Sequence, residues 1–247
     1  FIGSSLIYNV TAESITVTSV KLKWVVDENA SDLKMTYRIG VLNGTDDTLL
    51  VRQTTNEIEV EITGLIPGTL YNFTVFPIVY DNGTEGEEMS RKIYTRPSPV
   101  HNLTAESIGV TSVTLKWEVT DSASDSYTYR IEIVNGTFVE NRRFNETKAE
   151  IANLTAGTLY NFTVFTVAAD NETEGEGVSI DLYTRPSPVH NLTAESIGVT
   201  SVTLKWEMND SASDSYTYRI EVVNGTDNTL LMNKPFSETK AEITGLI

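Results

Sequence analysis

The sequence predicts an all-β chain built from tandem antiparallel β-sandwiches, and three observations support this prediction. The segment from Arg96 to Thr137 returns 89 residues later as Arg185 to Thr226 with only three substitutions. Within each copy, apolar residues alternate with polar residues at a period of two, the spacing of half-buried strands. Turn-forming residues recur about every 8 to 12 residues. A repeat of about 90 residues with this pattern holds roughly seven short strands, which is enough for one sandwich.

The second copy of the repeat shows the expected elements most clearly. Its inward-facing residues include Val113, Leu115 and Trp117, which alternate with polar neighbours. We expect strands over residues 100–107, 113–118, 127–133 and 149–154, with turn clusters at 121–125 and 135–137. Because Trp24 and Trp206 stand at the same position in the other copies, we expect one buried tryptophan in each unit.

A second informative stretch precedes the next strand of each complete repeat. Tyr71 follows Leu-Ile-Pro-Gly-Thr-Leu, and Tyr160 follows Leu-Thr-Ala-Gly-Thr-Leu. In both copies the tyrosine opens an alternating apolar run. A tyrosine placed in this way, with its hydroxyl bonded back to the preceding turn, is the tyrosine corner of Greek-key sandwiches. We therefore expect Tyr71 and Tyr160 to belong to the structural core together with the three tryptophans.

The repeat spacing divides the chain into units that follow one another end to end. We expect an N-terminal fragment edge at residues 1–7, which does not resemble a signal peptide, complete repeats at 8–95 and 96–184, and a third repeat at 185–247. The third repeat reaches the corner and lacks the last two strands. Because this would leave an apolar sheet face open, we expect the third repeat either to be partly disordered or to be completed by another chain or by a segment absent from this sequence.

The linkers between the repeats are short and contain two prolines each. The first is Arg96-Pro97-Ser98-Pro99, and the second has the same sequence from Arg185 to Pro188. Proline-rich linkers of this length are stiff. We therefore expect limited hinge freedom between neighbouring repeats.

Composition excludes several functional classes. The net charge is −16, from 34 acidic and 18 basic residues, so binding to nucleic acid or to an anionic membrane surface is disfavoured. No run of 18 or more apolar residues is present, so we expect no direct membrane insertion. The absence of cysteine excludes a disulfide framework, a thiolate metal site and a cysteine nucleophile.

No catalytic, cofactor-binding or metal-binding site is predicted. The two histidines, His101 and His190, occupy the same repeat position, so they form neither a catalytic triad nor a metal site. Four aspartates near the linkers could in principle bind calcium, but their spacing favours solvated turn residues. They are Asp121, Asp125, Asp210 and Asp214. The pair Glu85 and Glu87 could in principle serve glycoside hydrolysis, but we interpret it as part of a solvent-exposed acidic loop.

Asparagine usage points to an extracellular location. Fourteen of the eighteen asparagines begin an Asn-x-Ser/Thr sequon, several times more than chance predicts. Turn chemistry accounts for some of them, but not for Asn72 and Asn161, which lie inside an apolar strand pattern. We therefore predict N-glycosylation. The candidate sites are Asn9, Asn29, Asn43, Asn72, Asn82, Asn102, Asn135, Asn145, Asn153, Asn161, Asn171, Asn191, Asn209 and Asn224.

Several stretches resemble a known family. The tryptophan on the second strand, the Leu-x-Pro-Gly-x-x-Tyr corner and the missing cysteine pair resemble fibronectin type III domains and not immunoglobulin domains. The corner GLIPGTLYNFTV, the loops DNGTEGEE and DNETEGEG, and the linker YTRPSPV are similar to the extracellular repeats of receptor-type protein tyrosine phosphatases. The similarity extends over residues 8–247. In that family the enzyme is a separate intracellular domain with a nucleophilic cysteine, so the resemblance implies that this chain is not an enzyme.

The resemblance implies a glycosylated ectodomain segment of a single-pass cell-surface receptor. Such a segment acts as a semi-rigid spacer and presents surface to an extracellular protein ligand or for self-association. One alternative is an adhesion or extracellular-matrix protein built from the same modules. A further alternative is a spacer from a secreted carbohydrate-active enzyme.

Overall fold

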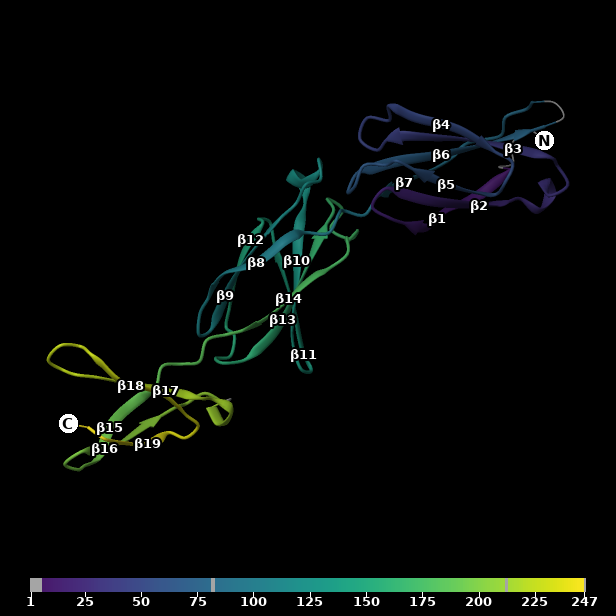
Figure 1. Cartoon of the computed structure of the whole chain (residues 1–247). Coiled ribbons are helices and arrows are strands. Elements are labelled where there is room, and N and C mark those ends of the chain that lie inside the picture. The colour runs from purple at the N-terminus through teal and green to yellow at the C-terminus, as the bar shows by residue number, and fades with distance from the viewer. Residues whose placement is uncertain (1–5, 81–82, 212, 247) are drawn as a thin grey trace.

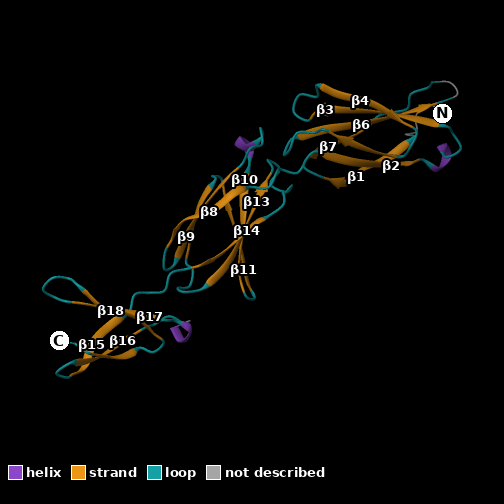
Figure 2. Cartoon of the chain, viewed as in Figure 1, coloured by secondary structure: helices purple, strands orange, loops and turns teal. Residues whose placement is uncertain are grey.

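The structure, a computed structural model, describes residues 6–80, 83–211 and 213–246. Three β-rich units follow one another along the chain, end to end (Figure 1). Strands dominate every unit, and the only helices in the described residues are single 3-10 turns (Figure 2). None of these turns is long and apolar enough to cross a membrane.

The first unit is a sandwich of two antiparallel sheets. One sheet has three strands in the order β1-β2-β5, and the other has four in the order β4-β3-β6-β7. A 3-10 turn, η1 (Glu28–Ala30), links β2 to β3. The strands are β1 (Ile7–Ile15), β2 (Ser19–Val26), β3 (Met35–Asn43), β4 (Leu49–Thr55), β5 (Glu59–Thr63), β6 (Leu70–Val79) and β7 (Met89–Tyr94).

The second unit repeats this topology strand for strand. Its sheets have the orders β12-β9-β8 and β11-β10-β13-β14. The turn η2 (Ser124–Ser126) occupies the place of η1. The strands are β8 (His101–Ile108), β9 (Ser112–Glu118), β10 (Thr128–Asn135), β11 (Phe138–Phe144), β12 (Lys148–Ala152), β13 (Leu159–Val167) and β14 (Val178–Tyr183).

The third unit has five strands within the described residues. They form a sheet in the order β15-β16-β19 and a pair, β17-β18. Val202, Leu204 and Ile220 are only half-buried there, although their equivalents in the second unit are fully buried. In the second unit β13 covers these positions with Phe162 and Val164. The strands are β15 (His190–Ile197), β16 (Ser201–Glu207), β17 (Tyr218–Val223), β18 (Leu230–Phe236) and β19 (Lys240–Thr244), with η3 (Ser213–Ser215) between β16 and β17.

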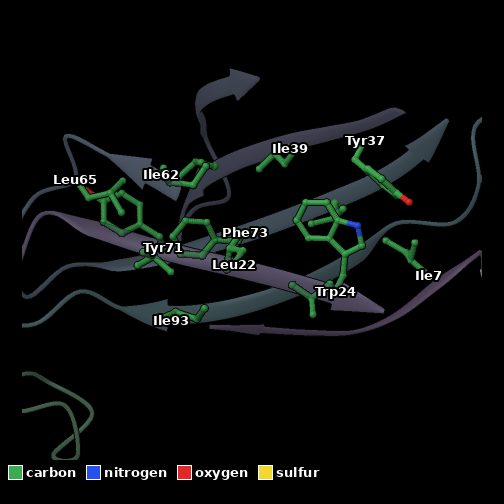
Figure 3. Close-up of a cluster of buried hydrophobic side chains, with 14 residues drawn as sticks. Ile7, Leu22, Trp24, Tyr37, Ile39, Ile62, Leu65, Tyr71, Phe73 and Ile93 are labelled. Atoms are coloured by element: carbon green, nitrogen blue, oxygen red, sulfur yellow. The ribbon is translucent and has the colours of Figure 1, made fainter. Parts of the chain in front are cut away.

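Each core is organised around one tryptophan. In the first unit Trp24 is 1% exposed and lies between the two sheets with Tyr37, Leu22 and Phe73 (Figure 3). The rings of Trp24 and Tyr37 meet edge to face with centroids 5.0 Å apart. The same pair recurs as Trp117 with Tyr129 at 5.2 Å and as Trp206 with Tyr218 at 5.3 Å. Such edge-to-face contacts add about 0.5–1.5 kcal/mol to the burial of the rings themselves.

Two details differ from the sequence expectation. First, Leu6 and Ile7 are buried, and β1 begins at Ile7, inside the segment that we expected to be a fragment edge. Second, the first strand of each unit is bulged and does not alternate strictly, with a register shift after Tyr8, His101 or His190. The next residue, an asparagine, has a φ of 52–58° in all three units. Asparagine tolerates this left-handed conformation better than most residues, and the bulge restores the inward alternation that follows.

The tyrosine corner is present in both complete units. The Tyr71 hydroxyl accepts a hydrogen bond from the Ile66 N–H at 2.9 Å, and the Tyr160 hydroxyl accepts one from the Thr155 N–H at 2.9 Å. Tyr71 and Tyr160 are 3% and 5% exposed. Each ring therefore packs in the core while its hydroxyl fixes the preceding turn.

The corner bond gives a testable prediction. Tyr160→Phe leaves the partly buried Thr155 N–H without its acceptor, so the free energy of unfolding of the second unit should fall by about 1–3 kcal/mol. Denaturant unfolding of the whole chain, followed by tryptophan fluorescence, measures the change. Tyr183→Phe is the matched control, because Tyr183 is 63% exposed, and it should change the free energy by less than about 0.5 kcal/mol. Equal losses in the two variants would contradict a specific role for the corner.

Candidate functional site

The junction between the first two units is held by a buried aspartate. The Asp121 carboxylate is 8% exposed and accepts hydrogen bonds from the Ser98 N–H at 2.8 Å and from the Tyr127 hydroxyl at 2.9 Å. Ser98 lies in the linker, whereas Asp121 and Tyr127 flank the turn that leads into β10. The carboxylate therefore ties the linker backbone to the second unit.

Tyr127 also contacts the preceding unit. Its hydroxyl lies 3.3 Å from the Pro67 carbonyl and shares its hydrogen between that oxygen and Asp121. The ring lies so close to Gly68 that a Cβ there would be 1.9 Å from the tyrosine oxygen. The Gly68 N–H in turn donates to the Arg96 carbonyl at 3.2 Å. Glycine is therefore favoured at this corner for two reasons. It leaves room for Tyr127 at the contact between the units, and it adopts the left-handed φ of 57° without strain.

The second junction uses the same residues one repeat later. Asp210 accepts from the Ser187 N–H at 2.8 Å and from the Tyr216 hydroxyl at 3.0 Å. A Cβ on Gly157 would be 1.6 Å from the Tyr216 oxygen. We call each set of glycine, linker serine, aspartate and tyrosine a junction clamp: Gly68, Ser98, Asp121 and Tyr127 at the first junction, and Gly157, Ser187, Asp210 and Tyr216 at the second.

The clamps perturb the ionisation of their members. Removal from water and the neighbouring Asp121 carboxylate both raise the pKa of Tyr127, so its hydroxyl stays protonated and keeps donating. For Asp210, partial burial alone would raise the pKa, but the hydrogen bonds from Ser187 and Tyr216 outweigh it and lower the pKa. At the second junction, where burial and the Asp210 carboxylate also raise the pKa of Tyr216, the clamp therefore pairs a neutral donor with an ionised acceptor, a combination that strengthens a hydrogen bond.

The loop that follows β13 closes over the first junction. Arg130 donates from Nε and Nη2 to the two carboxylate oxygens of Glu174, both at 2.7 Å, and its guanidinium lies 3.9 Å from the centroid of the Phe165 ring. The hydrogen bonds from Arg130 lower the pKa of Glu174. Gly175 follows immediately, and a Cβ there would be 2.6 Å from the Pro97 carbonyl. The ion pair thus holds the loop against the linker.

The first unit repeats this arrangement. Arg38 pairs with Glu85 through two hydrogen bonds and lies 4.5 Å from the Phe76 ring centroid. Gly86 packs against Leu6, the residue that precedes β1. Each of these loops carries the sequence Thr-Glu-Gly. A glutamate that pairs with an arginine and a glycine that packs against the segment before the first strand are therefore a repeated feature of the units.

These findings change the interpretation of the aspartates. The sequence favoured solvated turn residues, and this is wrong for Asp121, which is buried because it bonds the linker and Tyr127. Asp125 and Asp214 are exposed in η2 and η3. In the residues that the structure describes, no three His, Cys, Asp or Glu side chains are grouped to hold a metal ion. The clamp was missed because Gly68 and Ser98 are distant from Asp121 in sequence, although the identical DSASDSY at both junctions was a visible signal.

The histidines and the acidic pair have no catalytic geometry. Nδ1 of His101 lies 3.6 Å from Glu118, and Nδ1 of His190 lies 3.6 Å from Glu207, with both histidine side chains partly exposed. Glu85 pairs with Arg38, while Glu87 is exposed. A hollow in the third unit is lined by Trp206, Leu204 and other residues. It lies on the face that β13 covers in the second unit, so we assign no ligand to it.

The sequon asparagines are accessible wherever the structure describes them. Asn82 lies outside the described residues. Eight of the other thirteen are exposed, and Asn43, Asn72, Asn135, Asn161 and Asn224 are half-buried. Asn72 and Asn161 point away from the cores that their strand neighbours Phe73 and Phe162 enter.

The comparison with protein families matches these units directly. Residues 5–96 and 98–180 match the fibronectin type III domain. The chain belongs to the fibronectin type III family. Its all-β fold of tandem sandwiches is therefore confirmed, as is the resemblance to this family that the tryptophan and the tyrosine corner indicated.

Curated relatives of this fibronectin type III chain include receptor phosphatases. The chain is 54% identical, over 98% of its length, to receptor-type tyrosine-protein phosphatase eta of Gallus gallus, and 36% identical over 65% of its length to the Homo sapiens protein of that name. It is 24% identical over 92% of its length to Gallus gallus tenascin. It spans 17%, 12% and 12% of these relatives. The predicted similarity to receptor-type phosphatases and the predicted extracellular location are confirmed.

One solved structure that matches the chain is a two-domain fibronectin type III segment of chicken tenascin. It has a TM-score of 0.46 and 18% identity, with 72% of this chain and 99% of that chain covered.

The Arg130–Glu174 pair gives a prediction with a definite pH dependence. Glu174→Gln removes the charge of a pair whose side chains are 19% and 28% exposed, so the second unit should lose about 1 kcal/mol of unfolding free energy at pH 7. Because Arg130 lowers the pKa of Glu174, this stabilisation is complete above the unfolded value of about 4.3 and is lost as the pH falls through the lower folded value. The difference between wild type and variant should shrink as the pH falls below about 5.

Urea unfolding at a series of pH values measures this difference. Glu176→Gln is the control, because Glu176 is exposed in the same loop, and it should leave the stability unchanged at every pH. A difference between wild type and Glu174→Gln that is constant with pH would show that the ion pair is not its source.

Proposed function

We propose that this chain is a non-catalytic, N-glycosylated segment of a receptor-type tyrosine phosphatase ectodomain, where it acts as a semi-rigid spacer. The observation that carries the proposal is the 54% identity to receptor-type tyrosine-protein phosphatase eta over 98% of the chain. The parent is a single-pass cell-surface protein whose catalytic domain is separate. Fibronectin type III modules without cysteine supply none of that chemistry.

The junction clamps support the spacer role. Each neighbouring pair of units shares a clamp in which an aspartate fixes the linker and a tyrosine contacts the corner glycine of the preceding unit. A hinge at the first junction would have to break the hydrogen bonds of Asp121 and separate Tyr127 from Gly68. Two prolines in the linker limit the remaining backbone freedom. The units therefore act as a rod whose length grows with the number of repeats.

The division into units is part of the same proposal. We place the repeats at residues 8–95, 96–184 and 185–247, and we extend the first repeat to Leu6, because Leu6 and Ile7 are buried and β1 begins at Ile7. Arg96 donates its N–H to the Thr16 carbonyl of the first unit, while Ser98 is bound by Asp121 of the second. The effective boundary is thus Pro97, which is buried between the two units.

Glycans and protein partners complete the proposed role. The described sequons lie at the surface, so glycans would extend into solvent and keep the rod apart from other molecules. A surface that remains between them is available to an extracellular protein ligand or to a second copy. An adhesion or matrix protein is the second candidate, and the 24% identity to tenascin favours it less strongly than the identity to the phosphatase favours the first.

The spacer role predicts that Gly68→Ala loosens the first junction. The new Cβ would overlap the Tyr127 hydroxyl, so Tyr127 must move and the contact between the units is lost. Small-angle scattering of the glycosylated chain should show a broader distribution of end-to-end dimensions. Gly64→Ala is the matched control, because Gly64 also has a positive φ, of 75°, but a Cβ there would meet no atom within 4 Å, so only local strain is added.

The comparison has two outcomes that would contradict the spacer. One is a wild-type chain that already samples a broad distribution of dimensions. The other is an equal broadening in Gly68→Ala and Gly64→Ala.

A further inference from the structure

One edge of the four-stranded sheets carries exposed apolar side chains, and the same feature recurs in the third unit. Leu49 and Leu50 begin β4, Phe138 and Val139 begin β11, and Leu230 and Leu231 begin β18. All six are between 48% and 56% exposed. The same pair of positions is therefore apolar and open to solvent three times along the chain, where polar residues would suffice for a surface strand.

These strands are also open at the backbone. β4 and β11 are edge strands of their sheets, and β18 pairs only with β17 among the described strands. The opposite edges, β7 and β14, lie against β1 and β8 of the facing sheet, and Arg91 donates to the Val10 carbonyl across the first of these contacts at 3.1 Å. An edge strand with unpaired N–H and C=O groups and apolar side chains is a template for pairing with another chain, and natural proteins cover or charge such edges.

A sequon stands beside each of these apolar pairs. Asn43, Asn135 and Asn224 each begin an Asn-Gly-Thr turn that leads into the edge strand. Asn135 is paired directly with Phe138 in the register. Asn43 and Asn224 donate their N–H groups to the residues just before Leu49 and Leu230. Side chains opposite one another in antiparallel strands lie about 5 Å apart, so Asn135 adjoins Phe138 directly, while Asn43 and Asn224 are bonded to Thr48 and Thr229, one residue before the apolar pairs.

The amides of two of these asparagines are oriented for a sugar. Oδ1 of Asn43 accepts from the Thr45 N–H at 2.9 Å, and Oδ1 of Asn224 accepts from the Thr226 N–H at 2.8 Å. Their Nδ2 atoms, which would carry the glycan, donate no hydrogen bond to any residue that the structure describes. By contrast, Nδ2 of Asn161 is bonded to Asp181 at 2.8 Å.

We propose that N-glycans on Asn43, Asn135 and Asn224 cover the apolar start of the edge strands and keep these edges from pairing with a second copy of the chain. The inference rests on the glycosylation in the proposed function and gives it a specific task. The C–H faces of a sugar ring pack on exposed aliphatic and aromatic side chains, while its bulk prevents another strand from reaching the edge.

The need for a cover is greatest at β11. The strand Phe-Val-Glu-Asn-Arg-Arg-Phe is self-complementary when it pairs antiparallel with a copy of itself about Asn141. Glu140 then faces Arg142 of the copy, and Phe138 faces Phe144 of the copy. A second sequon, Asn145, follows the far end of the strand. Glycans on Asn135 and Asn145 would thus guard both ends of the most self-complementary edge.

The other two edges have additional protection in their sequences. Antiparallel pairing of β4 with its copy about the middle of the strand would place Arg52 opposite Arg52, and like charges repel. β18 contains Pro235, which has no N–H to donate. Loss of glycans should therefore expose β11 first.

The test compares glycan-deficient variants expressed in cells that attach N-glycans. Site-specific glycopeptide mass spectrometry first establishes the occupancy of Asn135 and Asn145. Sedimentation velocity then measures self-association of the whole chain. Asn135→Gln/Asn145→Gln should dimerise at least about tenfold more tightly than wild type. Thr104→Ala/Thr155→Ala is the matched control, which removes the sequons of Asn102 and Asn153 outside the four-stranded sheet, keeps these two asparagines at their positive φ, and should leave the association unchanged.

A rescue variant identifies the surface responsible. Adding Phe138→Thr and Val139→Thr to Asn135→Gln/Asn145→Gln removes the apolar pair but keeps β-forming residues, so the chain should return to the monomer. If the glutamine variants do not fold, enzymatic removal of glycans from the folded wild-type chain supplies the same comparison, with the Phe138→Thr/Val139→Thr protein as the control.

The outcomes separate this inference from the proposed function. An unoccupied Asn135 would overturn the covering role, whereas a lack of glycan at every sequon would overturn the glycosylated segment as a whole. If Asn135 is occupied but the glycan-deficient chain remains monomeric, the cover is refuted and the spacer is unaffected. Equal dimerisation of the two double variants would refute a role specific to β11.

Discussion

The structure depends on the edge-to-face contact between one tryptophan and one tyrosine in each sandwich. Trp117 projects from β9 and Tyr129 from β10, so this contact joins the two sheets at the centre of the core. Tyr127 lies two residues before Tyr129, on the same side of the chain, and its hydroxyl reaches the preceding unit. Because the period of a strand is two, the core contact that fixes Tyr129 also aims Tyr127 at the junction. Folding of a unit and docking of its neighbour are therefore coupled through one strand.

This coupling explains why the junctions are alike. The clamp uses residues that belong to the repeat itself, so each copy of the repeat brings its own aspartate and tyrosine to the corner glycine of the copy before it. In the first unit, Met35 occupies the place of Tyr127, so the tyrosine belongs to the second and third copies only. Stiffness is then a property of an array of such copies, in which each interface depends mainly on its two neighbours.

Sequence reasoning recovered the elements that depend on local periodicity. The alternation around Trp117 and the turn before Tyr160 placed the strands and the corner, because both signals lie within a few residues of each other. The buried state of Asp121 could not be found in this way, because its partners Ser98 and Tyr127 come together only after the linker folds back. The bulge at Asn102 was missed for a related reason: the positive φ of an asparagine leaves the pattern of apolar residues almost unchanged.

Near-identical neighbours and exposed sheet edges both favour unwanted association in such an array. Copies as similar as Arg96–Thr137 and Arg185–Thr226 could exchange strands, and a long rod brings many sheet edges into solvent.

One edge of each complete sandwich is closed internally, since β7 and β14 lie against the first strand of their own unit. The other edge begins with apolar residues, and no second strand among the described residues pairs with it. Three other features can prevent such an edge from pairing with another chain: charge on the strand, a proline and an attached glycan. The units use different ones, namely Arg52 in β4, Pro235 in β18 and two flanking sequons at β11. The number of sequons around each edge strand is therefore highest where the sequence of the strand is most self-complementary, as expected if the glycans limit association between chains.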